Sequence, residues 1–377
     1  MRIPRWLVVL VAVMVSTGGF LYWKTLPPES ITVVSWGDAY GRAQTVALFH
    51  PYTDKSGVDV TVKNYGGGLK EIAAQVQAGD VDWDVVDLEL EDAASACRQG
   101  LLERLDGIIQ LPPGIDGSRA ARDFVQGALG PCWVGSVVYS QVVAFDSLRF
   151  QGDKPSTVAD FFNLAKFPGP RGLKDSGPKF NLELALIADG VPPWRVYPAL
   201  ATKGGLDRAF AKLDTIKDSI VWWRRAAEPS EMLARGEVAM TTSLNSRVFS
   251  IAAEPRIRTI WDGQLYQLDV FGIPKGSRKK ERALDFIAFA TGPAPLAEEA
   301  RWLPYGPARQ SALRLVGRNP ETQEEMRKHL PTAPQNFRRA LAVDPDWWNQ
   351  RGAEAEARWA EWRAGTGGRK AESGSQN

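Results

Sequence analysis

The sequence contains few of the residues that most often hold metals or carry nucleophilic catalysis. Its 377 residues include two histidines, His50 and His329, and two cysteines, Cys97 and Cys132. A zinc site takes three or four such ligands close together, and these four residues do not readily offer that set. No nucleophile–histidine–acid motif stands out either. We therefore expect no metal, no cofactor and no catalytic residue.

A strong charge of one sign is also absent. The chain carries 46 lysine and arginine residues against 44 aspartate and glutamate residues, for a formal net charge of +2. Without a basic field to attract nucleic acid, a nucleic-acid partner is not expected. The hydrophobic content of 44% is that of a globular protein, and the length favours two domains over one.

No apolar run reaches the length of a confident membrane-spanning helix. Arg2 and Arg5 precede an apolar stretch from Leu7 to Val15, whereas a spanning helix needs roughly 18–20 apolar residues. A cationic start followed by such a stretch is typical of a signal peptide or a short anchor. We expect residues 1–29 to export the chain, and both cleavage and retention of this segment stay open.

An even number of cysteines in an exported chain favours a disulfide. A bond between Cys97 and Cys132 closes a loop for which the chain-entropy relation gives roughly 4 kcal/mol of stabilisation. The alternative is a pair of buried thiols.

Strand and helix patterns alternate along the first third of the chain. The strand-like runs are residues 31–36, 58–62 and 83–88, and the helical patterns are residues 41–55, 69–78 and 91–99. This βαβαβ order predicts an α/β fold with a mainly parallel sheet and helices on both faces.

Two long strand-like runs, residues 133–145 and 265–273, are apolar enough to cross from one sheet into another. They predict two discontinuous lobes with a hinge, a design that suits closure around a ligand. The first lobe is expected to comprise residues 30–138 plus about 270–315, and the second about 139–269 plus about 316–364. Residues 365–377 have nothing to bury and are expected to be disordered.

The end of the first predicted strand carries Trp36, with Asp38 and Tyr40 close behind. In an open α/β sheet, ligands collect outside the carboxyl ends of the strands. Aromatic faces beside a carboxylate suit a small organic cation. The alternative is a core tryptophan followed by an ordinary turn.

Several segments together resemble periplasmic solute-binding proteins of the spermidine/putrescine type. They are Ile31–Tyr40, Tyr65-Gly-Gly-Gly-Leu, Trp83-Asp-Val-Val-Asp, Phe167-Pro-Gly-Pro-Arg-Gly, Arg235-Gly-Glu-Val-Ala-Met and Ile273-Pro-Lys-Gly-Ser-Arg-Lys-Lys-Glu-Arg-Ala-Leu-Asp-Phe-Ile. The resemblance implies a monomeric, non-catalytic periplasmic receptor of an ABC importer. Its two lobes, of the type II-like arrangement, would close on a polyamine-like cation and deliver it to an inner-membrane permease.

The same resemblance implies the binding residues. Trp36 matches the aromatic of the first strand, Tyr40 falls near a second aromatic, Asp269 matches a carboxylate on the returning crossing strand, and Tyr305 matches a late aromatic. Three further candidates, Glu89, Glu91 and Asn245, occupy places where the family makes ligand contacts. Glu89 and Glu91 could instead be charge partners of a helix start.

Departures from the polyamine pattern keep other ligands open. Leu244 (or Ser243) and Gln267 stand where polyamine binders often carry tryptophan, and residues 176–181 lack the expected carboxylates. An amino acid, a sugar or another small solute is the alternative, and Arg247 inside the cleft would favour a zwitterion. A remote alternative is an exported hydrolase that uses paired carboxylates, such as Glu89 and Asp269.

Overall fold

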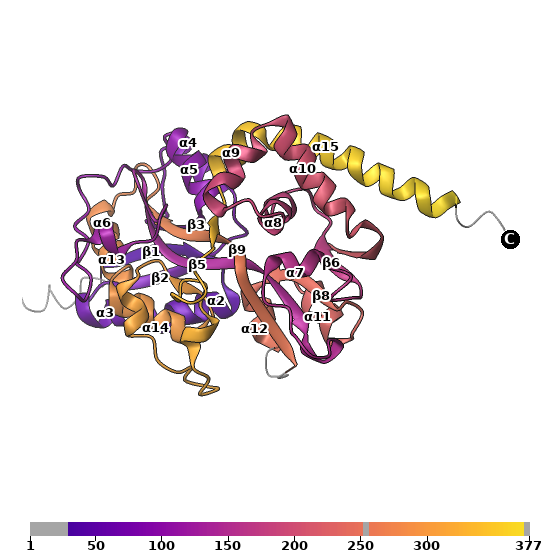
Figure 1. Cartoon of the computed structure of the whole chain (residues 1–377). Coiled ribbons are helices and arrows are strands. Elements are labelled where there is room, and N and C mark those ends of the chain that lie inside the picture. Colours follow the sequence, from indigo (N-terminus) through magenta and orange to yellow (C-terminus); the bar gives the residue numbers. More distant parts are fainter. Residues whose placement is uncertain (1–28, 252–255, 373–377) are drawn as a thin grey trace, which may run out of the picture.

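The chain folds into two lobes that share one continuous sheet (Figure 1). The computed structural model describes residues 29–251 and 256–372. The expected signal or anchor segment therefore lies, apart from Glu29, outside the described residues. Within the described residues, no helix combines the length and the apolar character that crossing a membrane would need.

The sheet is parallel within each lobe and antiparallel where the lobes meet. Its main strand order is β2-β1-β3-β9-β5-β8-β6-β7. In the first lobe β1 pairs in parallel with β2 and β3, and in the second β6 pairs in parallel with β7 and β8. These strands are β1 (Ser30–Ser35), β2 (Asp59–Asn64), β3 (Val85–Glu89), β5 (Trp133–Asp146), β6 (Arg171–Lys174), β7 (Ile220–Trp223), β8 (Met240–Leu244) and β9 (Ile257–Gly272).

The two longest strands, β5 and β9, pair with each other and run through both lobes. On β5, Val138 belongs to the core of the first lobe and Val143 to the core of the second. On β9, Leu265 packs in the second lobe and Leu268 in the first. The prediction of two crossing strands is therefore confirmed, and the cores change over near the middle of each strand.

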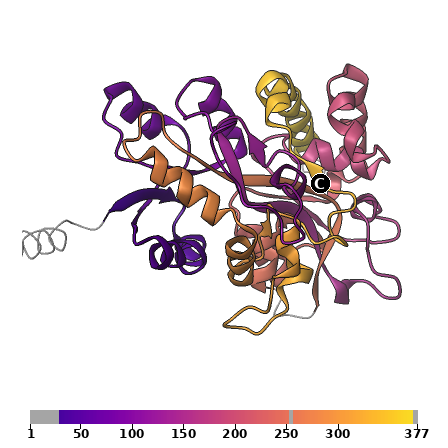
Figure 2. The ribbon, with the colours of Figure 1, turned by 90° about the vertical axis from the view of Figure 1, so that its left-hand side faces the viewer.

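Helices cover both faces of the sheet, as the view in Figure 2 shows. The segment predicted as one helix over residues 41–55 is a succession of α2, a π-helical turn η1 and α3, with Pro51 in the first turn of α3. That position tolerates proline because its N–H has no partner within the helix. The helices of the first lobe are α2 (Asp38–Gln44), η1 (Thr45–Phe49), α3 (His50–Ser56), α4 (Lys70–Ala78), α5 (Leu90–Arg98), α6 (Ala120–Asp123), α13 (Lys280–Ala290) and α14 (Pro293–Trp302).

The second lobe carries α7 (Val158–Phe162), α8 (Asn181–Ala188), α9 (Val196–Leu200), α10 (Lys203–Asp214), α11 (Glu228–Ala234), α12 (Asn245–Ile251) and α15 (Pro345–Glu372). Short strands and 3-10 turns complete the described chain. They are β4 (Leu129–Gly130), β10 (Gly306–Pro307), β11 (Leu341–Ala342), η2 (Ser147–Arg149), η3 (Pro193–Arg195), η4 (Lys217–Ser219), η5 (Ser311–Arg314) and η6 (Met326–His329).

The C-terminal helix α15 is held to the second lobe by tryptophans. Trp347, Trp348 and Trp359 lie in the core of that lobe. The helix runs to Glu372, and residues 373–377 lie outside the described residues. The disorder expected for residues 365–377 stays a prediction.

Residues 316–364, which the sequence assigns to the second lobe, pack in two places. Val316, Met326 and Leu330 pack with Leu296 of α14, which follows α13 in the first lobe. Residues 341–359 contribute to the core of the second lobe. The apolar side chains of the first stretch are buried against α14, a contact between distant segments that no local pattern indicates.

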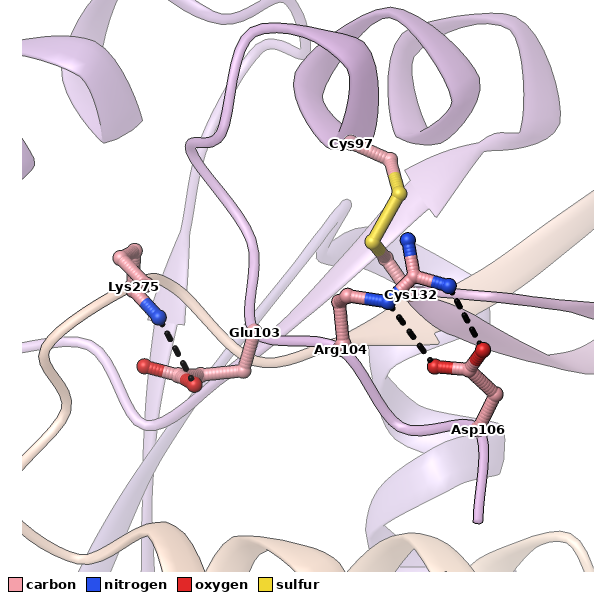
Figure 3. The surroundings of a disulfide bond; sticks show 6 residues. All are labelled: Cys97, Glu103, Arg104, Asp106, Cys132 and Lys275. Carbon is pink, nitrogen blue, oxygen red and sulfur yellow. Dashed lines mark hydrogen bonds and ion pairs between the residues drawn. A yellow bond between two sulfur atoms is a disulfide. The ribbon is translucent and has the colours of Figure 1, made fainter. Parts of the chain in front are cut away.

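The predicted disulfide joins Cys97, in the last turn of α5, to Cys132, just before β5 (Figure 3). The two Cα atoms are 5.8 Å apart. Beside the bond, Lys275 pairs with Glu103 and Arg104 pairs with Asp106. The prediction of a bond is thus confirmed, and the bond ties a surface helix to the start of a crossing strand.

Removing this bond should reduce stability without changing the fold. We expect Cys97→Ser combined with Cys132→Ser to lower the free energy of unfolding by roughly 4 kcal/mol, because the unfolded chain gains the freedom of the opened loop. Urea unfolding measures this difference. The wild-type protein under strong reductant is the matched control and should lose a similar amount, and no loss in either sample would contradict the prediction.

Candidate ligand-binding site

The candidate site lies where the first lobe meets the crossing strands. Glu89 ends β3 and is paired with Asp269 on β9, and Asp269 is paired in turn with Val137 on β5. Directly opposed residues of antiparallel strands point to the same face, so Glu89 and Asp269 share a face. Tyr139 lies two residues after Val137 on that face, and its hydroxyl donates to Glu89 Oε1 at 3.1 Å.

Aromatic rings surround this pair of carboxylates. Tyr305 lies between Tyr40 and Tyr139, with ring centroids 5.6 Å and 6.2 Å away. Trp36, directly after β1, packs on Tyr65 with centroids 5.3 Å apart. Burial is the largest cause of the raised pKa of all four tyrosines, and the nearby charge of Asp269 adds to it in each case.

Asp269 has a nearly buried carboxylate without a partner. Its exposed fraction is 7%, and across residues 29–251 and 256–372 no hydrogen-bond donor or cation contacts its side chain. Burial raises the pKa of Asp269 well above its ordinary value, and the charges of Asp87, Glu89 and Glu299 raise it further. A buried carboxylate in this state is costly, so an ammonium group entering here would be strongly stabilised.

Two more carboxyl groups lie beneath the aromatic rings. Asp87 Oδ2 accepts hydrogen bonds from Tyr40 at 2.9 Å and from Gln44 at 2.7 Å. Glu299 on α14 is fully buried, and neither of its carboxyl oxygens has a partner among the described residues. Burial raises the pKa of Asp87 to about 7 and that of Glu299 well above its ordinary value. Burial therefore disfavours the charged form of both groups.

Basic groups face this acidic side from the second lobe. Lys174 is the last residue of β6. Burial is the main cause of its lowered pKa, and the charge of Glu89 acts in the opposite direction and raises it. Arg247 on α12 is exposed and lies close enough to Tyr305 to affect its pKa. Opposite charges thus stand on opposite sides of the site.

The expected site residues separate into two groups in the structure. Trp36, Tyr40, Glu89, Asp269 and Tyr305 come together as described. The other two make contacts of their own. Glu91, in the first turn of α5, forms an ion pair with Lys179 of the second lobe. Asn245 is buried and bridges Ser140 on β5 and Pro304, next to Tyr305.

Sequence reasoning missed Tyr65, Tyr139, Asp87 and Lys174. Tyr139 alternates with apolar residues on a crossing strand, and Asp87 is a carboxylate within an apolar strand. Both patterns could have indicated a site, since a polar group in such a run needs a partner. Lys174 carries no comparable signal, because its position opposite Glu89 depends on how the two lobes are placed.

A cavity of about 870 Å³ lies between α5, β9 and residues 190–198. Its lining does not include Glu89, Asp269 or Tyr139. Three acidic residues line it. Glu91 and Asp346 form ion pairs with Lys179 and Arg98, and Asp344 accepts a hydrogen bond from the backbone N–H of Trp347. None of the three is a buried carboxylate without a partner, as Asp269 is.

Comparison with known proteins establishes the family. Residues 47–329 match the family model of the bacterial extracellular solute-binding proteins. The chain belongs to this family. Its members bind solutes, which supports a non-enzymatic transport role.

Individual relatives cover most of the chain. A γ-aminobutyric acid-binding protein of Pseudomonas aeruginosa is 39% identical over 337 residues, which is 89% of this chain and 91% of that protein. An ABC transporter substrate-binding protein from Bradyrhizobium japonicum is 33% identical, with a TM-score of 0.73 over 89% of this chain and 99% of the other. The Atu4243 GABA receptor is 30% identical, with a TM-score of 0.71 over 89% and 97%.

A solved structure described as polyamine-binding is more distant in sequence. A spermidine/putrescine substrate-binding protein from Streptococcus pneumoniae has a TM-score of 0.67 over 89% of this chain and 99% of the other, but is only 16% identical. The likeness to it is one of fold. Together these structures confirm the predicted two-lobed periplasmic-binding-protein architecture of this solute-binding protein, while the spermidine/putrescine subtype does not follow from them.

The placement of Trp36 should depend on Gly67. A Cβ atom at Gly67 would lie 2.8 Å from the Trp36 ring, and the residue has a φ of +83°. Gly68 has a φ of +78° but open space around it, and Gly66 has neither constraint. We expect Gly68→Ala to lower the free energy of unfolding by about 1–2 kcal/mol through backbone strain, Gly67→Ala to lower it by more, and Gly66→Ala to leave it nearly unchanged. Urea unfolding tests this order, and equal losses for Gly67→Ala and Gly68→Ala would refute the contact with Trp36.

The stability of the protein should fall as the pH rises from about 4 to about 7. In this range the folded protein keeps a proton on Asp87, whose pKa is raised to about 7, whereas the unfolded chain releases it. The folded state then binds more protons, so the free energy of unfolding decreases with pH. Asp87→Asn removes this group and should flatten the dependence, as measured by urea unfolding at several pH values. The exposed Asp153→Asn variant is the control, and an Asp87→Asn profile parallel to the wild type would contradict the assignment.

Proposed function

We propose that this protein is the substrate-binding component of an ABC importer and that it captures a small ω-amino acid such as γ-aminobutyric acid. The observation that carries the proposal is the division of charge across the site. Asp269 offers an unpaired, nearly buried carboxylate on the first-lobe side, and basic side chains stand on the second-lobe side. A ligand with an ammonium at one end and a carboxylate at the other would satisfy both.

Each end of such a ligand has a partner in the proposal. The ammonium would bind Asp269, with Glu89 next to it and the rings of Tyr139 and Tyr305 against the methylene chain. Cation–aromatic contacts add to this binding when the cation is desolvated. The carboxylate would bind Arg247, whose guanidinium lies near Tyr305 and suits a carboxylate better than an ammonium-bearing side chain does.

Relatives with known ligands support the same class. The Pseudomonas aeruginosa relative and the Atu4243 receptor are both described as binding γ-aminobutyric acid, and the Bradyrhizobium japonicum protein as a substrate-binding protein of an ABC transporter. The lobes joined by β5 and β9 would close around the ligand. Delivery would be to a membrane permease from the periplasmic side.

A polyamine-like diamine is the second candidate. The aromatic rings and Asp269 would hold one of its ammonium groups equally well. Its second ammonium would meet Arg247 and Lys174, because the described part of the second lobe places these basic groups there. Like charges at close range oppose binding, so the zwitterion is favoured.

Calorimetry with γ-aminobutyric acid, putrescine and spermidine tests the proposal. We expect γ-aminobutyric acid to bind most tightly, and Asp269→Asn and Arg247→Gln each to weaken it by about tenfold or more, since each loses a charge-assisted hydrogen bond. Asp153→Asn, which changes an exposed aspartate paired with Lys166, is the control and should bind normally. Tighter binding of putrescine, or full affinity in Asp269→Asn, would sink the proposal.

A further inference from the structure

We propose that Lys174 is the residue that excludes diamines from the site. This inference rests on the proposed function, because it concerns how the same site distinguishes γ-aminobutyric acid from putrescine. Both ligands are short, flexible chains with an ammonium at one end. They differ at the other end, which is a carboxylate in one and a second ammonium in the other. A fixed positive charge on the second-lobe side would separate them.

The backbone of Lys174 is held in place from two sides. It is the last residue of β6 and is paired with Trp223 on β7. Its carbonyl oxygen accepts a hydrogen bond from Asn181 Nδ2, at the start of α8, at 2.9 Å. Lys174 and Lys179 lie over the same Phe180 ring, and Lys179 forms an ion pair with Glu91 of the first lobe, so this strand end lies where the second lobe meets the first.

The ammonium group of Lys174 lacks a direct partner. Its Nζ lies 5.2 Å from the centre of the Phe180 ring, and within the described part of the chain no carboxylate or other acceptor forms a hydrogen bond or ion pair with it. The carboxylates that act on it from farther away are Glu89 in the first lobe and Glu356 on α15. A partly buried lysine in this state has an unsatisfied positive charge between the lobes.

The ring beneath Lys174 is held by a buried network. Phe180 has a φ of +76°, which is strained for a residue with a side chain. Its N–H donates to Glu183 Oε2 at 2.8 Å, and Glu183 Oε1 accepts from Tyr197 at 3.1 Å and from Trp348 Nε1 at 2.8 Å. Strain of this kind persists only where the surroundings enforce it, and here it keeps an aromatic face under the lysine.

Lys179 provides an internal contrast. Its Nζ also lies over the Phe180 ring, at 5.9 Å. Unlike Lys174, it forms an ion pair with Glu91, so its charge is largely offset. Both lysines therefore lie over the same ring, and of the two it is Lys174 that has no ion-pair partner among the described residues.

The decisive measurement is the ratio of the dissociation constants of putrescine and γ-aminobutyric acid, obtained by calorimetry for each variant. Lys174→Met should reduce this ratio by about tenfold, because an attraction for the carboxylate and a repulsion for the second ammonium both disappear. Lys174→Arg keeps the charge and should retain the wild-type ratio. Lys179→Met, the matched control, should change the ratio by less than about threefold. Thermal melting verifies that each variant is folded, and Lys174→Gln replaces Lys174→Met if the latter is not.

The possible results separate this inference from the proposed function. If the wild type prefers γ-aminobutyric acid and Lys174→Met keeps the full ratio, the proposed function stands and the role of Lys174 is wrong. If Lys179→Met shifts the ratio as far as Lys174→Met does, selectivity comes from the general charge of the lobe and the assignment to Lys174 is overturned. If the folded wild type does not bind γ-aminobutyric acid, both proposals fail.

Discussion

The antiparallel pairing of β5 with β9 is the constraint on which both the fold and the site depend. These two strands carry the chain from one lobe to the other and back, and their apolar side chains contribute to both cores. The same pairing sets the register that brings Asp269 opposite Glu89 and places Tyr139 beside them. A shift by one residue would turn these side chains to the opposite face. The same strand pairing therefore sets both the connection between the lobes and the candidate site.

Charged groups of opposite sign lie on the two sides of the candidate site. The first-lobe side holds four carboxyl groups, of which Glu89 is the most exposed and Asp269 is nearly buried without a partner, and the second-lobe side holds Lys174 and Arg247. Each side has charged groups that are costly to bury. The proposed zwitterion would compensate both sides at once.

Local patterns predicted the parts of the molecule whose structure depends on neighbours in the chain. The strands that end at Ser35 and Glu89 and the helices that follow them are where periodicity puts them. The family resemblance indicated Asp269 as a binding carboxylate, and its side chain has no hydrogen-bond partner among the described residues. The packing of Val316, Met326 and Leu330 with Leu296 of α14 depends on surfaces that distant segments supply, so local patterns do not indicate it.

The sequence by itself determined the α/β class, the two crossing strands and the disulfide, because each rests on residue types and spacing, and the family resemblance added an aromatic and acidic candidate site. Only the tertiary structure decided which charges face one another. Glu91 forms an ion pair with Lys179, and Asp269 has no partner among the described residues. Lys174, in the second lobe, is close enough to Glu89 of the first lobe for the charge of Glu89 to raise its pKa. Electrostatic energy depends on distance in space and on burial, and neither can be read from separation along the chain. The proposal of a zwitterion over a diamine therefore rests on the placement of the two lobes.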